Sequence, residues 1–213
     1  MQKLNFGPLV LKDKIDSDLV EELLNESKKL TIPYNNFLAG KIKNEYGFES
    51  EKIIKYSKIL NSYFDLYLHE LSKFKNIEIS NFKYEYDGMW VNIQKANEYN
   101  PPHNHAGHIS FVIYLKIDKS IYYEKNESIS SPAGSITFQF LHSNKVNGLQ
   151  SENLEKIDDL VSPINGHNVV PMVGDIIIFP SYLTHHVESF KSPESERISV
   201  AGNIILRKNN SIL

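Results

Sequence analysis

The chain has 213 residues, of which 41% are hydrophobic and 23% charged, a composition typical of a soluble protein with one sizeable core. A formal net charge of −3 argues against a broad cationic surface for nucleic acid. The absence of cysteine excludes disulfides, thiolate metal sites and cysteine nucleophiles. The lack of cysteine fits a cytoplasmic protein, and no apolar run resembles a signal peptide or a membrane span.

Two amphipathic helices are predicted in the N-terminal third. The first would begin at Asp16 or Ser17, because apolar side chains then recur at helical spacing and fade by Leu30. The second would begin near Ser50 and carry an apolar stripe over residues 53–71. Such a stripe is typical of a helix that packs on a sheet.

From about residue 77 the pattern changes to short β segments separated by turns. The predicted strands are Glu78–Tyr86, Met89–Lys95, Ile109–Ile117, Ser135–Phe140, Val169–Val170, Asp175–Phe179, His185–Ser189 and Arg197–Leu206. Many short strands after two helices favour a mainly β barrel or sandwich braced by helices on one face. The polar stretch 142–166 is either a lid or a variable surface loop.

A His-x-His pair precedes one of these strands. Residues two apart on an extended chain point to the same face, so His103 and His105 can reach one metal ion. Neutral imidazole suits divalent iron, zinc, copper or nickel. His185 follows the apolar strand 175–179 and a Pro-Ser turn, and its neighbour His186 should point to the opposite face. The alternative is that these histidines are ordinary polar residues near the surface.

The last predicted strand shows the strongest alternation in the chain. Arg197, Ser199 and Asn203 share one face, while aliphatic residues occupy the other. A charged residue inside a barrel needs a partner, and a dicarboxylate would supply one. The guanidinium fork can bind a carboxylate bidentately, and the serine hydroxyl can add a hydrogen bond. The alternative is an edge strand whose polar face is solvated.

In order and spacing, five segments resemble one known family, the 2-oxoglutarate-Fe(II) oxygenases of the prolyl-hydroxylase-like type found in phages and marine bacteria. The segments are Trp90–Ile93, His103–His105, Ser110–Leu115, Gly174–Ser181 and Glu196–Asn203. The resemblance covers roughly residues 80–206. It implies a double-stranded β-helix, a jelly-roll or cupin-like barrel, within a single domain over 1–213. Residues 1–76 would then form a helical support and residues 77–213 the barrel.

The resemblance also implies a set of site residues. Fe(II) would be bound by His103, His105 and His185, and Arg197 and Ser199 would hold the far carboxylate of 2-oxoglutarate. Further side chains that would bind the cosubstrate or line the pocket are Tyr114, Asn92 and Asn203. The enzyme would use O2 and 2-oxoglutarate to hydroxylate an unidentified substrate, with release of succinate and CO2.

One position departs from the family pattern. The usual iron triad is His-x-Asp/Glu followed by a distant histidine, and here His105 stands in the carboxylate position. Three neutral imidazoles would leave the charge of the ion uncompensated before the cosubstrate binds. Alternatively, His105 turns away and leaves a two-histidine site. His108 should point opposite to the pair and is left out of the ligand set.

Two other functions fit parts of the pattern. A cupin-like three-histidine metal enzyme would need no 2-oxoglutarate, but the expected cupin glutamate is missing, since residues 106–110 contain no acid. A non-catalytic barrel module would have no need of the Arg-x-Ser pair. The primary substrate is left open between a protein side chain, a small metabolite and a nucleobase. Fold-level analogy favours a homodimer.

Overall fold

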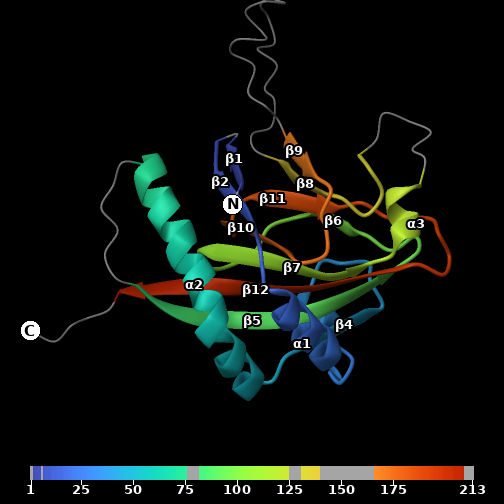
Figure 1. Cartoon of the computed structure of the whole chain (residues 1–213), viewed down its shortest axis with the longest axis horizontal. Helices are drawn as coiled ribbons and strands as arrows, with labels where there is room; N and C mark the ends of the chain where they lie inside the picture. The colour runs from blue at the N-terminus through green and yellow to red at the C-terminus, as the bar shows by residue number, and fades with distance from the viewer. Residues whose placement is uncertain (1, 6, 76–81, 125–130, 140–165, 209–213) are drawn as a thin grey trace, which may run out of the picture.

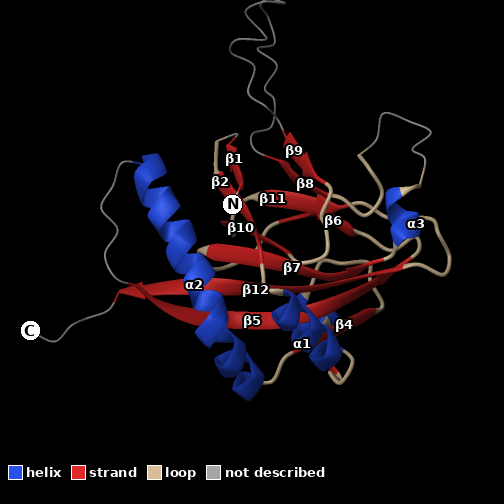
Figure 2. Ribbon diagram, in the orientation of Figure 1, coloured by secondary structure: helices blue, strands red, loops and turns tan. Residues whose placement is uncertain are grey.

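The computed structural model describes residues 2–5, 7–75, 82–124, 131–139 and 166–208, and within them the strands form two antiparallel sheets (Figures 1 and 2). The larger sheet has the order β1-β2-β10-β7-β12-β5-β4-β3, and the smaller has the order β6-β11-β8-β9. The strands are β1 (Gln2–Asn5), β2 (Leu9–Lys14), β3 (Ile32–Pro33), β4 (Asn44–Gly47), β5 (Phe82–Lys95), β6 (Asn100–His103), β7 (Ile109–Ile117), β8 (Ile136–Gln139), β9 (Gly166–Val169), β10 (Asp175–Pro180), β11 (Thr184–Val187) and β12 (Glu196–Lys208). The helices are α1 (Ser17–Ser27), the 3-10 helix η1 (Asn35–Phe37), α2 (Ser50–Lys75) and α3 (Lys119–Tyr122).

Strand β12 shows the alternation that the sequence predicts. It pairs with β5 on one side and β7 on the other. Ile198, Val200 and Ile204 belong to the core under the helices. Arg197 and Ser199 lie on the opposite face and line a cavity between the two sheets. The strand therefore separates an apolar layer from a polar one.

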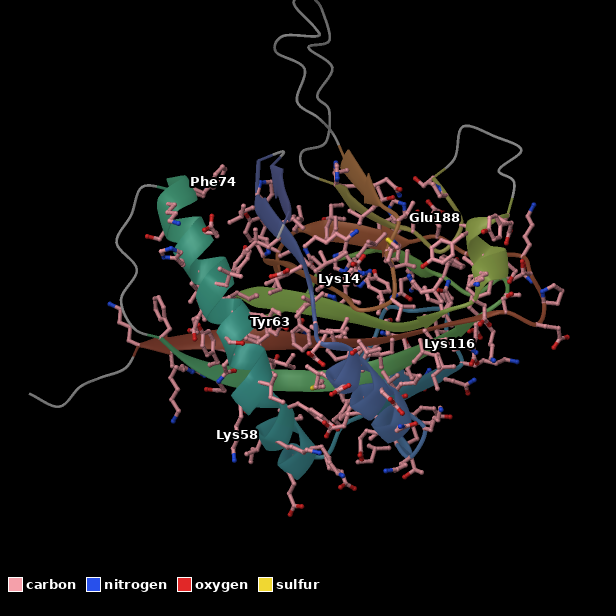
Figure 3. All side chains as sticks on the ribbon, viewed as in Figure 1. Lys14, Lys58, Tyr63, Phe74, Lys116 and Glu188 are labelled. Carbon is pink, nitrogen blue, oxygen red and sulfur yellow. The ribbon has the colours of Figure 1, made fainter. Side chains whose placement is uncertain are left out.

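The two predicted helices lie across one face of the larger sheet (Figure 2). Helix α1 is capped by Asp16, whose carboxylate accepts a hydrogen bond from the Asp18 amide at 2.8 Å. Helix α2 turns its apolar stripe to the sheet, while Lys58 extends into solvent (Figure 3). The hydroxyl of Tyr63 donates to the Lys14 carbonyl oxygen at 3.4 Å, which connects α2 to β2.

A second apolar cluster fills the space between the sheets. Phe138 of β8, Phe179 of β10 and Phe190 are almost completely buried there. Phe138 and Phe179 meet edge to face, with ring centroids 5.0 Å apart. This cluster and the cavity share the interior of the barrel, so the cavity has apolar walls on one side.

The N-terminal 76 residues are not only a helical support, because they also contribute β1, β2, β3 and β4 to the larger sheet. Strand β2 escapes prediction because Leu9, Val10 and Leu11 are all buried and so show no alternation. Strands β3 and β4 are short and lie where Asn, Tyr and Gly suggest a loop.

Two further elements differ from the sequence prediction, and a third predicted segment lies almost entirely outside the described residues. The two strands expected on either side of Gly88 form the single strand β5, and a bulge opposite Asn203 and Ile204 absorbs the irregularity. Strand β6, which carries His103, was not predicted, because two prolines occupy half of it. The polar stretch 142–166 lies outside the described residues except for Gly166, the first residue of β9.

Replacing Phe64 by Ala should destabilise the fold by about 3–5 kcal/mol, because large aromatic deletions leave a cavity in the core. The Phe64 ring is completely buried and lies 5.3 Å from the Phe111 ring, centroid to centroid. The control is Ile54→Ala on the same helix, where the side chain is 60% exposed and the cost should be small. Urea unfolding of both variants measures the difference, and similar midpoints would contradict this packing.

Candidate active site

Three histidines meet on the smaller sheet. His103 of β6 and His185 of β11 are direct cross-strand partners. His105 follows two residues after His103, and its amide donates to the Ser181 carbonyl oxygen at 2.9 Å. One ring nitrogen from each histidine lies within 4.8 Å of the others. The side chain of His105 therefore does not turn away, and the three imidazoles can reach one ion.

Backbone contacts fix the tautomers of two of these rings. The Nδ1 of His103 lies 2.7 Å from the Pro101 carbonyl oxygen, and the Nδ1 of His185 lies 2.9 Å from that of Leu183. Because a carbonyl oxygen only accepts, each Nδ1 must carry the proton. Each Nε2 then presents its lone pair, which is the arrangement that metal-binding histidines require.

The three imidazoles are neutral at pH 7. Burial lowers the pKa of His105 to about 4, and the neighbouring His103 adds to the effect. Burial also lowers the pKa of His103, and it lowers that of His185 well below its ordinary value. Neutral imidazole is the form that binds a metal ion, so no proton needs to be displaced.

The two other histidines near the pair point elsewhere, as predicted. The Nε2 of His186 lies 3.1 Å from Oε1 of Glu188, away from the cluster. The Nδ1 of His108 accepts a hydrogen bond from the Leu206 amide at 3.1 Å. Strand alternation separates His186 from His185 in β11, whereas His108 lies in the bend between β6 and β7.

Arg197 places a buried charge on the facing sheet. The residue is 2% exposed, and its Nη1 donates to the Gly134 carbonyl oxygen at 2.9 Å. Its guanidinium carbon lies 5.4 Å from the centroid of the Tyr114 ring. The Nε is buried without a partner, and none of the ion pairs among the described residues involves Arg197. A buried, unpaired guanidinium is costly, so this position needs an anion.

A cavity that is partly open to solvent joins these groups. The histidines line it from the smaller sheet, and the predicted residues that line it from the larger sheet are Asn92, Tyr114, Arg197 and Ser199. Asn203 was also predicted to bind the cosubstrate or line the pocket, but it is not among the residues that line the cavity. It lies opposite the bulge in β5, and its Oδ1 accepts a hydrogen bond from Ser110 Oγ at 2.8 Å.

The sequence matches a known family over this region. Residues 88–203, more than half of the chain, match the model of the family described as "Putative 2OG-Fe(II) oxygenase". The chain belongs to this family. It is therefore an oxygenase whose metal is Fe(II) and whose cosubstrate is 2-oxoglutarate. No curated protein sequence matches it.

Solved structures resemble this oxygenase over most of its length. A Pseudomonas putida prolyl-4-hydroxylase gives a TM-score of 0.50 at 15% identity, covering 94% of this chain and 93% of its own. The viral collagen prolyl hydroxylase of Paramecium Bursaria Chlorella virus-1, in complex with 2-oxoglutarate, gives 0.52 at 15% identity, with coverage of 93% and 96%. HygX from Streptomyces hygroscopicus, with nickel, 2-oxoglutarate and hygromycin B bound, gives 0.55 at 12% identity, with coverage of 96% and 84%. These similarities confirm the predicted jelly-roll fold.

Glu45 is a cavity residue of this oxygenase that sequence reasoning missed. It lies on β4 with an exposed fraction of 0%, in a short segment whose Asn, Tyr and Gly residues are more typical of a loop. Asn35 Nδ2 donates to its Oε2 at 3.2 Å, while its Oε1 is buried without a partner. Burial raises the pKa of Glu45 to about 7, and the charge of Glu98 adds to this. The only sequence signal for a buried Glu45 is the alternation over Asn44–Gly47, and four residues are too few to establish a strand period.

Glu45 continues a polar row that crosses the larger sheet. It is the cross-strand partner of Asn92, which in turn pairs with Ser199. Ser199 pairs with Tyr114 on β7. Because direct partners share a face, all four side chains point into the cavity.

Along the part of the chain that is described, no helix is both long and apolar enough to cross a membrane.

Glu45→Gln should stabilise the fold above pH 7 and have little effect at pH 4.5. The pKa of Glu45 is about 7 against an ordinary 4.5, so the folded chain holds this proton more tightly than the unfolded chain. The wild type therefore loses stability as the pH rises from 4.5 to about 7. Glu45→Gln should be more stable than the wild type by about 2 kcal/mol at pH 8. Thermal unfolding from pH 4.5 to 8 tests this. Glu194→Gln, at an exposed position, should change little at either pH.

Proposed function

We propose that His103, His105 and His185 bind Fe(II), and that Arg197 and Ser199 bind 2-oxoglutarate for the hydroxylation of a substrate, with release of succinate and CO2. The observation that carries the proposal is the buried guanidinium without an acidic partner, which faces the three-histidine cluster across one cavity. The residues fit both groups, because neutral imidazoles offer lone pairs and the unpaired cation needs an anion. When bound, iron and cosubstrate supply the oxidising chemistry.

Each residue on the larger sheet has a definite role in this proposal. The guanidinium of Arg197 would bind the far carboxylate of the cosubstrate, with the Ser199 hydroxyl as an additional donor. Tyr114 lies under the guanidinium and holds its position through a cation–π contact. Phe179, Ile136 and Val187 add apolar lining, which excludes water from the cavity.

The third histidine changes the charge of the site. A carboxylate in place of His105 would neutralise one charge of the ion, whereas three imidazoles neutralise none. The two negative charges of 2-oxoglutarate then supply the compensation. We therefore infer that metal and cosubstrate strengthen each other's binding, and this coupling is reciprocal by linkage.

We further propose that residues 1–213 form one domain, because strands from both sides of residue 77 build the larger sheet. A cytoplasmic location is part of this proposal and rests on the absence of cysteine in the sequence.

Replacing His185 by Ala should abolish stoichiometric Fe(II) binding, because it removes a ligand whose tautomer is set by the backbone. The neighbouring variant His186→Ala should keep the metal, since His186 points to Glu188 instead. Anaerobic equilibrium dialysis with Fe(II) compares the two. Equal metal content in both variants would contradict the ligand assignment.

Replacing Arg197 by Ala should weaken 2-oxoglutarate binding by about 100-fold, since removing one partner of a buried charge pair costs about 2–5 kcal/mol. The protein is titrated anaerobically with Fe(II) and then 2-oxoglutarate, and the visible metal-to-ligand charge-transfer band is followed. Arg207→Ala is the matched control, because Arg207 lies on the same strand but is exposed and pairs with Glu85.

The same titration separates this proposal from its two rivals. A band that forms in the wild type and is lost in Arg197→Ala supports the oxygenase site. Iron binding without a band would favour the cupin-like enzyme, which needs no 2-oxoglutarate. A protein that binds no metal would be a non-catalytic barrel module.

A further inference from the structure

We propose that Glu45 and Asn100 form a substrate subsite that binds an ammonium or guanidinium group of the primary substrate. The inference deepens the proposed function and rests on it. Both side chains line the cavity that holds the three histidines and Arg197. Among the described residues, Glu45 does not belong to the possible metal-ligand cluster. Glu45 would therefore contact the substrate and not the metal.

Two oxygens converge in front of Gly40. A Cβ atom built on Gly40 would lie 2.7 Å from Glu45 Oε1 and 2.9 Å from Asn100 Oδ1. Both oxygens are buried, and neither has a hydrogen-bond partner. Gly40 has no side chain to push these oxygens aside, and Gly40, Glu45 and Asn100 all line the cavity. Because both oxygens lie close to the same point and border the same cavity, one donor group of a ligand can bridge them.

A donor group of the primary substrate would satisfy the Glu45 oxygen. An amide can turn to present its nitrogen, but an ionised carboxylate only accepts, so Glu45 fixes the polarity of the subsite. The Oδ1 of Asn92, the strand partner of Glu45, is a third buried acceptor without a partner. The dianion of 2-oxoglutarate offers acceptors and no donor, so it cannot satisfy these oxygens.

Charge favours a cation over a neutral hydroxyl group. Glu45 takes part in none of the ion pairs within the described residues, and its nearest charged influence, Glu98, is also acidic. Burial raises the pKa of Glu45, and a cation beside it would restore the ionised form.

An aromatic wall stands beside the same space. The indole of Trp90 lines the cavity and stacks on the Tyr34 ring, with centroids 5.8 Å apart. Trp90 also lies 5.8 Å from the His105 ring, centroid to centroid. An indole face attracts a cation that is shielded from water. The indole therefore lines the same cavity as Glu45 and Asn100 and lies near the histidine cluster.

The test uses protein loaded with Ni(II) and 2-oxoglutarate, titrated by calorimetry with 1,5-diaminopentane and with 1,5-pentanediol as its neutral match. The wild type should bind the diamine at least about 10-fold more tightly than the diol, which corresponds to about 1.4 kcal/mol. Glu45→Gln should erase this preference while keeping its affinity for 2-oxoglutarate. If the diamine bound only through nickel, Glu45→Gln would bind it as tightly as the wild type does. That result would overturn the proposal.

A second variant tests the same space without removing the carboxylate. Gly40→Ala places a methyl group between the two oxygens and should also abolish diamine binding. Glu98→Gln is the control, because it removes a nearby negative charge that does not line the cavity. Glu98→Gln should keep the preference for the diamine over the diol. If this variant lost the preference, the overall negative charge near the cavity, and not the subsite, would select the cation.

The source of the cation is tested with acetyl-Gly-Lys-Gly-amide beside the diamine. Binding of the peptide alone would point to a lysyl side chain of a protein, and binding of the diamine alone would point to a free amine. A loaded wild type that binds neither probe, or binds amine and diol equally, overturns the subsite and leaves the proposed function intact. A protein that does not load Ni(II) and 2-oxoglutarate overturns the proposed function and the subsite with it.

Discussion

The buried charge of Arg197 is the constraint on which the arrangement of this oxygenase depends. A guanidinium inside a barrel requires polar neighbours and a cavity in which an anion can meet it. Strand β12 meets this requirement by strict alternation, with Arg197 and Ser199 on one face and aliphatic side chains on the other. The apolar residues displaced to the outer face then need their own cover, which α1 and α2 provide. The helices are thus a consequence of a polar interior.

The parts of this fold that could be predicted are those with a long periodic pattern. Strand β7 has the predicted bounds, and the alternation in β12 identified the side chains that face the cavity. Alternation also separated His185 from His186. The prediction failed where an element was short or buried on both faces, as in β2, because neither case produces a readable period.

Glu45 shows why part of the site escaped prediction. Its strand has four residues, and nothing in the sequence distinguishes this acid from those on the surface. Only the pairing of β4 with β5 brings it into line with Asn92 and so into the cavity. By contrast, His103, His185 and Arg197 were found because their order and spacing resemble those of the family, and His105 because it stands two residues from His103. A residue outside that pattern becomes visible only through tertiary structure.

The division of the site between two sheets has a mechanical consequence. The histidines come from the β6–β11 side, where each of these strands has four residues, whereas Arg197 belongs to a strand of thirteen that is paired on both sides. Short ladders open more readily than long ones, so the smaller sheet is the part that local unfolding would release first. A molecule that reaches from the histidines to Arg197 would connect the weak sheet to the strong one. A bound molecule would then hold the two sheets together. The backbone amides of β6 and β11 would exchange with solvent hydrogen much more slowly than in the empty protein.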